Sequence, residues 1–154
     1  MKYLIPMVII VALVFYFFMP ASEEKDASLE IELLLNNLTK SGQRKDIEVV
    51  MEYFSPDYSD SSDRTYMSVK EIIEKSFERF DSINAGFSNL IVSTIKDENG
   101  DDKTLANVDV WVSGNRDGTT FKLIGTKDDP KNINIGFQSI MFGGWKIKSV
   151  EDLQ

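Results

Sequence analysis

The stretch IEVVMEYFSPDYSD, residues 47–60, contains the sequence signal that best defines the fold. Its apolar side chains recur at the spacing of one buried helix face, at Ile47, Val50, Met51 and Phe54. Residues 55–57, Ser-Pro-Asp, follow directly, and proline cannot continue a helix. The pattern therefore predicts a helix over about residues 44–54 that ends in an aromatic residue, then a turn-rich segment with one short strand over 57–66.

A further helix is predicted on each side of this stretch. Upstream, residues 29–40 are mostly apolar with one polar face, and Ser41-Gly42 is expected to end that helix. Downstream, the run from Ser68 to Glu71 has the form of a capping box, which marks the start of a helix. The apolar stripe of this third helix is Val69, Ile72, Ile73, Phe77 and Phe80.

After Gly86 the apolar residues alternate with a period of two, which is typical of strands. Strands are predicted over residues 87–96, 104–113, 119–127, 133–142 and 145–150. Turns are predicted at Asn99-Gly100, at residues 115–118 and at Gly143-Gly144. Helices followed by a meander of antiparallel strands predict an α+β fold, with three helices on the concave side of a curved sheet.

The segment 47–60, the order of the helices and the strands that follow resemble a nuclear transport factor 2-like domain. This cone-shaped, cystatin-type fold is shared with SnoaL-like polyketide cyclases and ketosteroid isomerases. The resemblance covers about residues 28–151. It says little about function, because the fold supports enzymes, pocket binders and assembly modules alike.

For the enzymes of that group, the resemblance implies an aspartate base just after the turn, with a tyrosine and a protonated aspartate as hydrogen-bond donors. The candidates are Asp60 or Asp63 as the base, and Tyr58, Tyr66 or Asp109 as the partner. If Asp109 is buried among apolar walls, its carboxyl would have a raised pKa and could donate a hydrogen bond.

Domains of this shape often hold an apolar ligand beneath the helices. The aromatic residues expected to line such a pocket are Tyr53, Tyr58, Tyr66, Trp111 and Phe121, whereas Phe54 is expected in the core. Trp111 and Asp109 share a strand face opposite three valines. That face either closes the pocket or forms the surface of a homodimer.

Composition excludes several kinds of chemistry. The sequence has no cysteine and no histidine, which removes disulfides, thiol catalysis and most transition-metal sites. Its net charge is −8 without a basic stretch, so no nucleic-acid partner is expected. The acidic run SPDYSDSSD (55–63) lacks the glycine and the terminal glutamate of a Ca²⁺ loop, and DENGDDK (97–103) fits a solvated hairpin tip. We therefore expect no metal and no cofactor.

The first 22 residues, MKYLIPMVIIVALVFYFFMPAS, indicate the location of the protein. Residues 3–19 contain no charge, Lys2 precedes them and acidic residues follow, which predicts a membrane segment with the C-terminal domain outside the cytoplasm. The poor cleavage site favours a signal anchor, and the alternative is a cleaved signal peptide with a secreted or periplasmic product. The expected division is 1–22 anchor or signal peptide, 23–28 linker and 29–154 folded domain.

Two functions remain open from sequence. The first is a membrane-tethered, non-enzymatic domain at the cell envelope that binds a protein or a small apolar ligand and dimerises through its sheet. The second is an isomerase, cyclase or dehydratase that uses a pocket aspartate and a tyrosine. We favour the first, because acid–base catalysis needs positioned groups that the sequence does not place.

Overall fold

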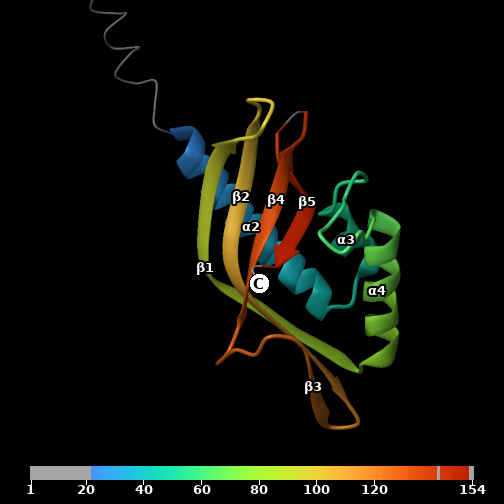
Figure 1. Ribbon diagram of the computed structural model, residues 1–154. Coiled ribbons are helices and arrows are strands. Elements are labelled where there is room, and N and C mark those ends of the chain that lie inside the picture. The colour runs from blue at the N-terminus through green and yellow to red at the C-terminus, as the bar shows by residue number, and fades with distance from the viewer. Residues whose placement is uncertain (1–21, 142, 153–154) are drawn as a thin grey trace, which may run out of the picture.

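The computed structural model describes residues 22–141 and 143–152, so the predicted membrane segment, residues 3–19, lies outside the described part. Its helices are α2 (Ser22–Gln43), α3 (Ile47–Glu52) and α4 (Tyr66–Arg79). Its strands are β1 (Ser82–Lys96), β2 (Asp102–Arg116), β3 (Thr119–Ile124), β4 (Lys131–Ser139) and β5 (Trp145–Asp152) (Figure 1). None of the helices in these ranges has the length and apolar run needed to cross a membrane. The expectation of an α+β domain with three helices and an antiparallel sheet is confirmed.

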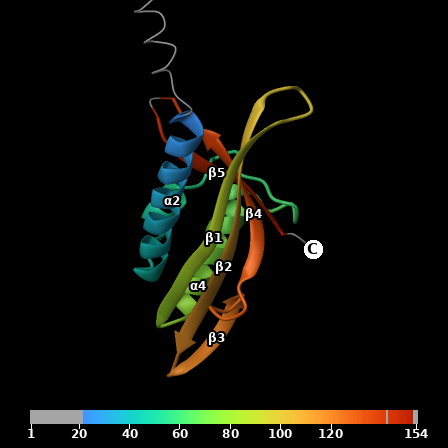
Figure 2. The same ribbon diagram turned by 90° about the vertical axis from the view of Figure 1, so that its left-hand side faces the viewer.

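All neighbouring strands of the sheet are antiparallel, in the order β1-β2-β4-β5. The short strand β3 pairs with the C-terminal end of β2, beyond the part that pairs with β4, and this hairpin extends away from the rest of the sheet (Figure 2). Its two-residue loop is Asp117-Gly118, with positive φ angles of 52° and 76°. Both signs are those of a type I′ turn, so the predicted turn is confirmed.

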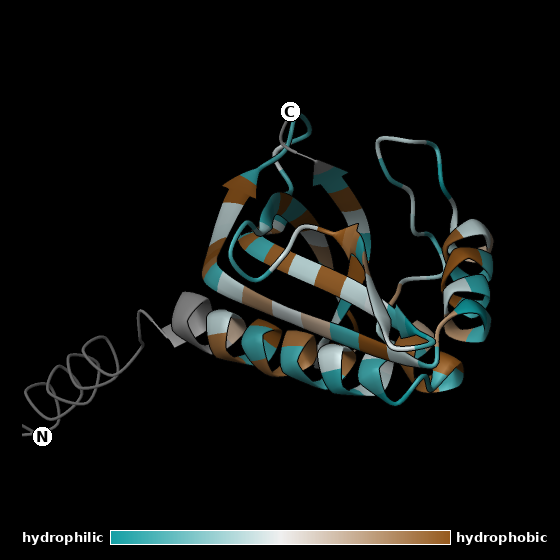
Figure 3. Cartoon of the chain, turned by 90° about the horizontal axis from the view of Figure 1, so that it is seen from below, coloured by the Kyte–Doolittle hydropathy of each residue, from teal (hydrophilic) through white to brown (hydrophobic). Residues whose placement is uncertain are grey.

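The core lies between α2 and one face of the sheet. Apolar and polar residues alternate along the strands, and α2 runs along the sheet (Figure 3). The buried cluster joins Ile31, Leu34 and Leu35 of α2 to Ala106, Val108, Ile133, Ile135, Phe137 and Ile147 of the sheet. We call this side of the sheet the inner face and the other side the outer face.

The first helix is longer than the sequence predicted. It begins at Ser22, so the polar residues 23–28, expected as a linker, form its first turns. It continues past Ser41-Gly42 and ends where Lys45 adopts a φ of 58°. The amides of Lys45 and Asp46 then donate to the carbonyls of Gly42 and Ser41, which is the hydrogen-bond pattern of a Schellman motif.

Several other boundaries also differ from the predictions. The capping box of α4 is formed by Thr65 and Ser68 and not by Ser68 and Glu71, because the helix begins one turn earlier at Tyr66. Strand β1 begins at Ser82 and not at residue 87, since Ile83 already takes a buried inner-face position. Gly86 therefore lies within β1 and does not mark the start of a strand.

Candidate functional site

An apolar cavity of about 320 Å³ lies on the inner face of the sheet. Its walls come from the three helices, from Phe54 after α3 and from all five strands, and include Leu38, Phe77, Phe87, Val110 and Val150. Among the described residues that line it, Thr39 is the one with a polar side chain and none is charged. The size is that of small-molecule pockets, at the lower end of a typical range of roughly 300–1,000 Å³.

Helix α4 forms one side of the cavity, and Tyr66 and Val69 in its first turn pack against the core. No side chain of α4 is buried, although Ile73 and Phe77 point toward the cavity wall. Lys45 and Phe80 fix the C-terminal end of this helix, since the Lys45 ammonium donates to the Phe80 carbonyl at 2.9 Å. The Phe80 ring fills the space above Gly114, where an added Cβ would lie 2.4 Å from the ring. The helix thus closes one side of a hollow.

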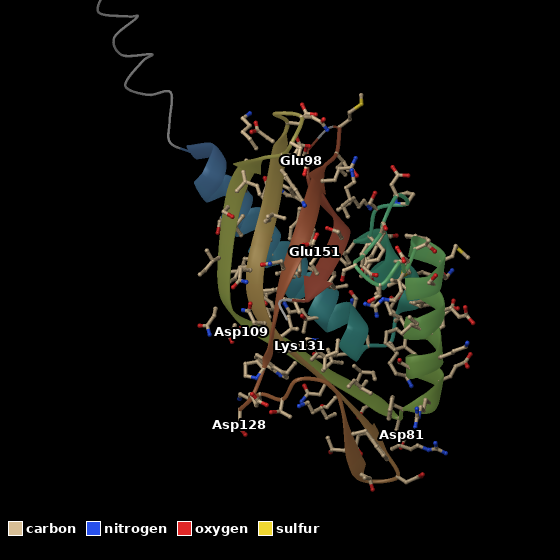
Figure 4. All side chains as sticks on the ribbon, viewed as in Figure 1. Asp81, Glu98, Asp109, Asp128, Lys131 and Glu151 are labelled. Atoms are coloured by element: carbon tan, nitrogen blue, oxygen red, sulfur yellow. The ribbon has the colours of Figure 1, made fainter. Side chains whose placement is uncertain are left out.

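A second hollow, of about 560 Å³, adjoins the apolar cavity, and we call it the mouth. Four residues line both spaces: Val110, Ile124, Ile133 and Val150. In contrast to the cavity, the mouth carries charged side chains, namely Arg64, Lys122, Lys131 and Asp129. Figure 4 shows Lys131 toward the lower end of the sheet, between Asp109 and α4.

The candidate base Asp60 is buried and fully hydrogen-bonded. Its Oδ1 accepts from the amides of Ser62 (2.9 Å) and Arg64 (3.1 Å), and its Oδ2 accepts from the Arg64 Nε (2.7 Å) and the Tyr58 hydroxyl (3.1 Å). Burial alone raises the pKa of the Asp60 carboxyl, but these hydrogen bonds together outweigh burial and hold the pKa below its usual 3.8. Asp60 is therefore an ionised anchor of its loop, and it does not line the cavity.

The other two acidic candidates lie elsewhere. Asp63 is exposed in the loop before α4, with a φ of 57°. Asp109 lies on the outer face, on the side of the sheet away from α4 (Figure 4). Hydrogen bonds from Asn132 and Asn89, each 2.7 Å long, hold the pKa of Asp109 below 3.8. The condition for a raised pKa, burial among apolar walls, is not met, because Asp109 faces away from the apolar wall.

Asp109 is one end of a polar network on the outer face. Asn132 donates to Asp109 and exchanges hydrogen bonds with Asn107, which in turn donates to Asn134. These residues come from β2 and β4, and Asn89 adds a residue of β1 at a register shift of the sheet. The strand face that carries Trp111 and Asp109 is therefore the outer face, and it does not close the pocket.

The aromatic residues expected in the pocket are scattered. Trp111 borders the cavity through its position in β2, but it alternates with the inner-face valines, and its indole packs over Gly86 on the outer face. Tyr58 is buried in the core, Tyr66 packs against the core, and Tyr53 lines a separate groove between α2 and the β4–β5 hairpin. Phe121 is 40% exposed and contacts Phe80.

Sequence reasoning missed most of the actual wall. It assigned Phe54 to the core, and it did not single out the aliphatic residues of the sheet or Phe77 as pocket residues. The stripe of α4 was recognised, but a stripe cannot show whether it meets a core or a hollow. Within the described ranges, no group of three or more acidic side chains is placed to hold a metal ion.

Comparison with known proteins identifies the fold. No protein-family model matches the sequence, and no curated protein matches it. Among solved structures, a candidate scytalone dehydratase from Novosphingobium aromaticivorans superposes with a TM-score of 0.69 at 14% identity, over 86% of each chain. A nuclear transport factor 2-like superfamily protein from Salmonella enterica gives 0.63 at 15% identity, over 82% of this chain and 89% of that one.

A third similar structure is Bd1075 from Bdellovibrio bacteriovorus, with a TM-score of 0.61 and 12% identity. The match covers 81% of this chain but 40% of the length of Bd1075. At such identities the likeness establishes the fold and nothing finer. The chain has a nuclear transport factor 2-like, or cystatin-like, fold, as the sequence predicted.

Proposed function

We propose that the protein is a non-enzymatic, exported domain that binds a small apolar ligand beneath its helices. The observation that carries this proposal is the cavity of about 320 Å³, whose described lining has no charged side chain. Apolar walls recognise a ligand by removing its surface from water, at about 25 cal/mol per Å². Acid–base catalysis would instead need a titratable group within hydrogen-bond reach of the reacting atoms.

The alternative is an isomerase, cyclase or dehydratase. It is favoured by the similar fold of the candidate scytalone dehydratase. It requires a base in the pocket, however, and Asp60 is held by four hydrogen bonds outside the cavity while Asp109 lies on the outer face. If the protein is such an enzyme, Asp60→Asn, Asp63→Asn or Asp109→Asn should abolish proton exchange in carbonyl substrates.

The proposed setting is the cell envelope. Residues 3–19 would anchor the chain in the membrane with the domain outside the cytoplasm, in accordance with Lys2 before the segment and the acidic residues after it. Cleavage and release of the domain is the alternative. Full-length protein that remains in the membrane after alkaline extraction, and whose domain is digested by protease added outside the cytoplasm, would support the tethered form.

Ligand binding can be tested with decanol and the full chain held in nanodiscs of zwitterionic lipid. Equilibrium dialysis against labelled decanol, with empty nanodiscs subtracted, should show binding of about one molecule per chain. Ala85→Phe fills the inner-face wall and should remove that binding, whereas Ile91→Phe alters a residue that is 65% exposed outside the cavity and should not. Equal binding by the two variants would contradict the proposal.

A further inference from the structure

The mouth and the cavity differ sharply in chemistry although they share four wall residues. The described lining of the cavity is apolar except for Thr39, whereas the described lining of the mouth includes Arg64, Lys122, Lys131 and one acidic residue, Asp129. The chain as a whole has a net charge of −8, so three cationic side chains among the described lining of one opening are unusual for this molecule, although one of them, Arg64, is paired with Asp60. A ligand that spans both spaces would need an apolar tail and a negatively charged head.

Lys131 and Arg64 are placed at the mouth by identifiable features. Lys131 pairs with Val110 and precedes Ile133 by two residues on the same strand, so its side chain leaves from the inner face at the end of the apolar wall. The Arg64 Nε is held by the buried Asp60 carboxylate, which offsets part of its charge but fixes the guanidinium beside the opening. Lys122, on β3, is exposed and also lines the mouth.

The size of the cavity limits the tail. A methylene group occupies about as much space as a water molecule in the liquid, roughly 30 Å³. A cavity of 320 Å³ therefore holds a single chain of about ten carbons. The larger mouth, of about 560 Å³, leaves room for a head group.

We propose that the natural ligand is a single-chain anionic amphiphile, with its tail in the apolar cavity and its carboxylate or phosphate between Arg64, Lys122 and Lys131. This inference rests on the proposed function and adds the chemical class of the ligand. The same chemistry occurs in a free fatty acid and in a lysolipid with an acidic head.

The test compares ligands that share a ten-carbon tail and differ in their head group. The full chain is held in zwitterionic nanodiscs, and the binding of each ligand to empty nanodiscs is subtracted. Decanoate should bind about fivefold or more tightly than decanol, since each exposed charge contributes a few tenths to about 1 kcal/mol. Decyltrimethylammonium should bind more weakly than decanol. Decanoyl-lysophosphatidylglycerol, tested beside decanoate, distinguishes a lipid-derived ligand from a free acid, and a preference for either anion over decanol supports the proposal.

Variants of the charged residues test the contacts to the head group independently of the contacts to the tail. Lys122→Glu should remove most of the preference for decanoate and leave decanol binding unchanged, and Lys131→Gln should act in the same direction. Lys40→Gln, an exposed change on α2 outside both spaces, is the matched control and should have no effect. Equal affinity for decanoate and decanol in the unaltered chain would overturn the anionic head while leaving the cavity in place; no binding of decanol would overturn the proposed function itself.

Discussion

Asp60 stabilises the loop between α3 and α4 through both oxygens of its carboxylate. The acceptor positions face two backbone amides, a tyrosine hydroxyl and a guanidinium, so every nearby group donates a hydrogen bond. The side chain is fully buried, with 0% exposure. The sequence predicted an acidic residue just after the turn. It could not show the four donors around the carboxylate, which are known only from the folded loop and which give Asp60 a structural role.

Asp60→Asn should destabilise the domain by about 2–3 kcal/mol. The amide would turn donor hydrogens toward the donors that now surround the carboxylate, which leaves buried groups unsatisfied. Urea unfolding measures the loss. Asp63→Asn is the matched control, because that side chain is exposed and its φ of 57° suits asparagine, so the change should stay within about 0.5 kcal/mol. Equal stability of the two variants would contradict the role of Asp60.

The same carboxylate makes a definite contribution to acid stability. Its pKa is lowered on folding from the usual 3.8, so the unfolded state binds the proton more readily. The stabilisation is complete above pH 3.8 and is lost as the pH falls through the lower pKa of the folded state. Urea midpoints measured between about pH 7 and pH 2.5 should fall less steeply in Asp60→Asn than in the unaltered chain below about pH 4. An equal fall of the urea midpoint in the two proteins below pH 4 would show that Asp60 does not contribute to acid stability.

Gly86 is required by the indole of Trp111, its partner across β1 and β2. An added Cβ would lie 2.2 Å from Trp111 Cζ2, so Gly86→Ala should cost about 1–3 kcal/mol and change the tryptophan fluorescence. Gly42→Ala is the control, since nothing lies within 4 Å of its Cβ position in helix α2. It should instead stabilise by about 0.5–1 kcal/mol. A stable Gly86→Ala with unchanged fluorescence would contradict the close approach.

At the scale of elements, sequence periodicity identified each helix and strand but not how deeply each is packed. The apolar stripe of α4 has the same spacing as a core helix, yet no residue of α4 is buried. The reason lies outside the helix: its position is fixed at its C-terminal end by Phe80 on Gly114 and by Lys45, and these contacts join distant parts of the chain. The cavity is a consequence of that placement, so the stripe alone could not predict it.

Helix α4 should therefore open more readily than the helix and strands of the core. Without ligand, hydrogen exchange followed by mass spectrometry should show faster exchange in residues 66–79 than in α2, because few buried apolar contacts hold α4 closed. Saturating decanoate should slow the exchange of α4 and leave β2 residues 104–108 unchanged. Protection of α4 equal to that of α2 without ligand, or an unchanged rate with bound decanoate, would contradict this picture.

At the scale of the whole molecule, the two faces of the sheet have different compositions. The inner face meets the helices and the cavity, and the outer face combines the asparagine network with Ile91 and Ile95, which are 65% and 45% exposed. The sequence predicted a face with Trp111 and Asp109 that either lined a pocket or formed an interface, and alternation alone could not choose. The strand register places Asp109 and Trp111 on the outer face. A homodimer interface is therefore the remaining proposal for this face.

A dimer through the outer face should place the same residues of two copies close together, because a two-fold interface brings one patch against itself. The chain has no cysteine, so single cysteines can be introduced without background. Ile91→Cys and Ile95→Cys in the full chain in membranes should be joined by a short bismaleimide. Met67→Cys, equally exposed on α4 at 68%, should remain monomeric. Crosslinking at all three positions would indicate random collision, and crosslinking at none, with one chain per nanodisc by mass photometry, would exclude the dimer.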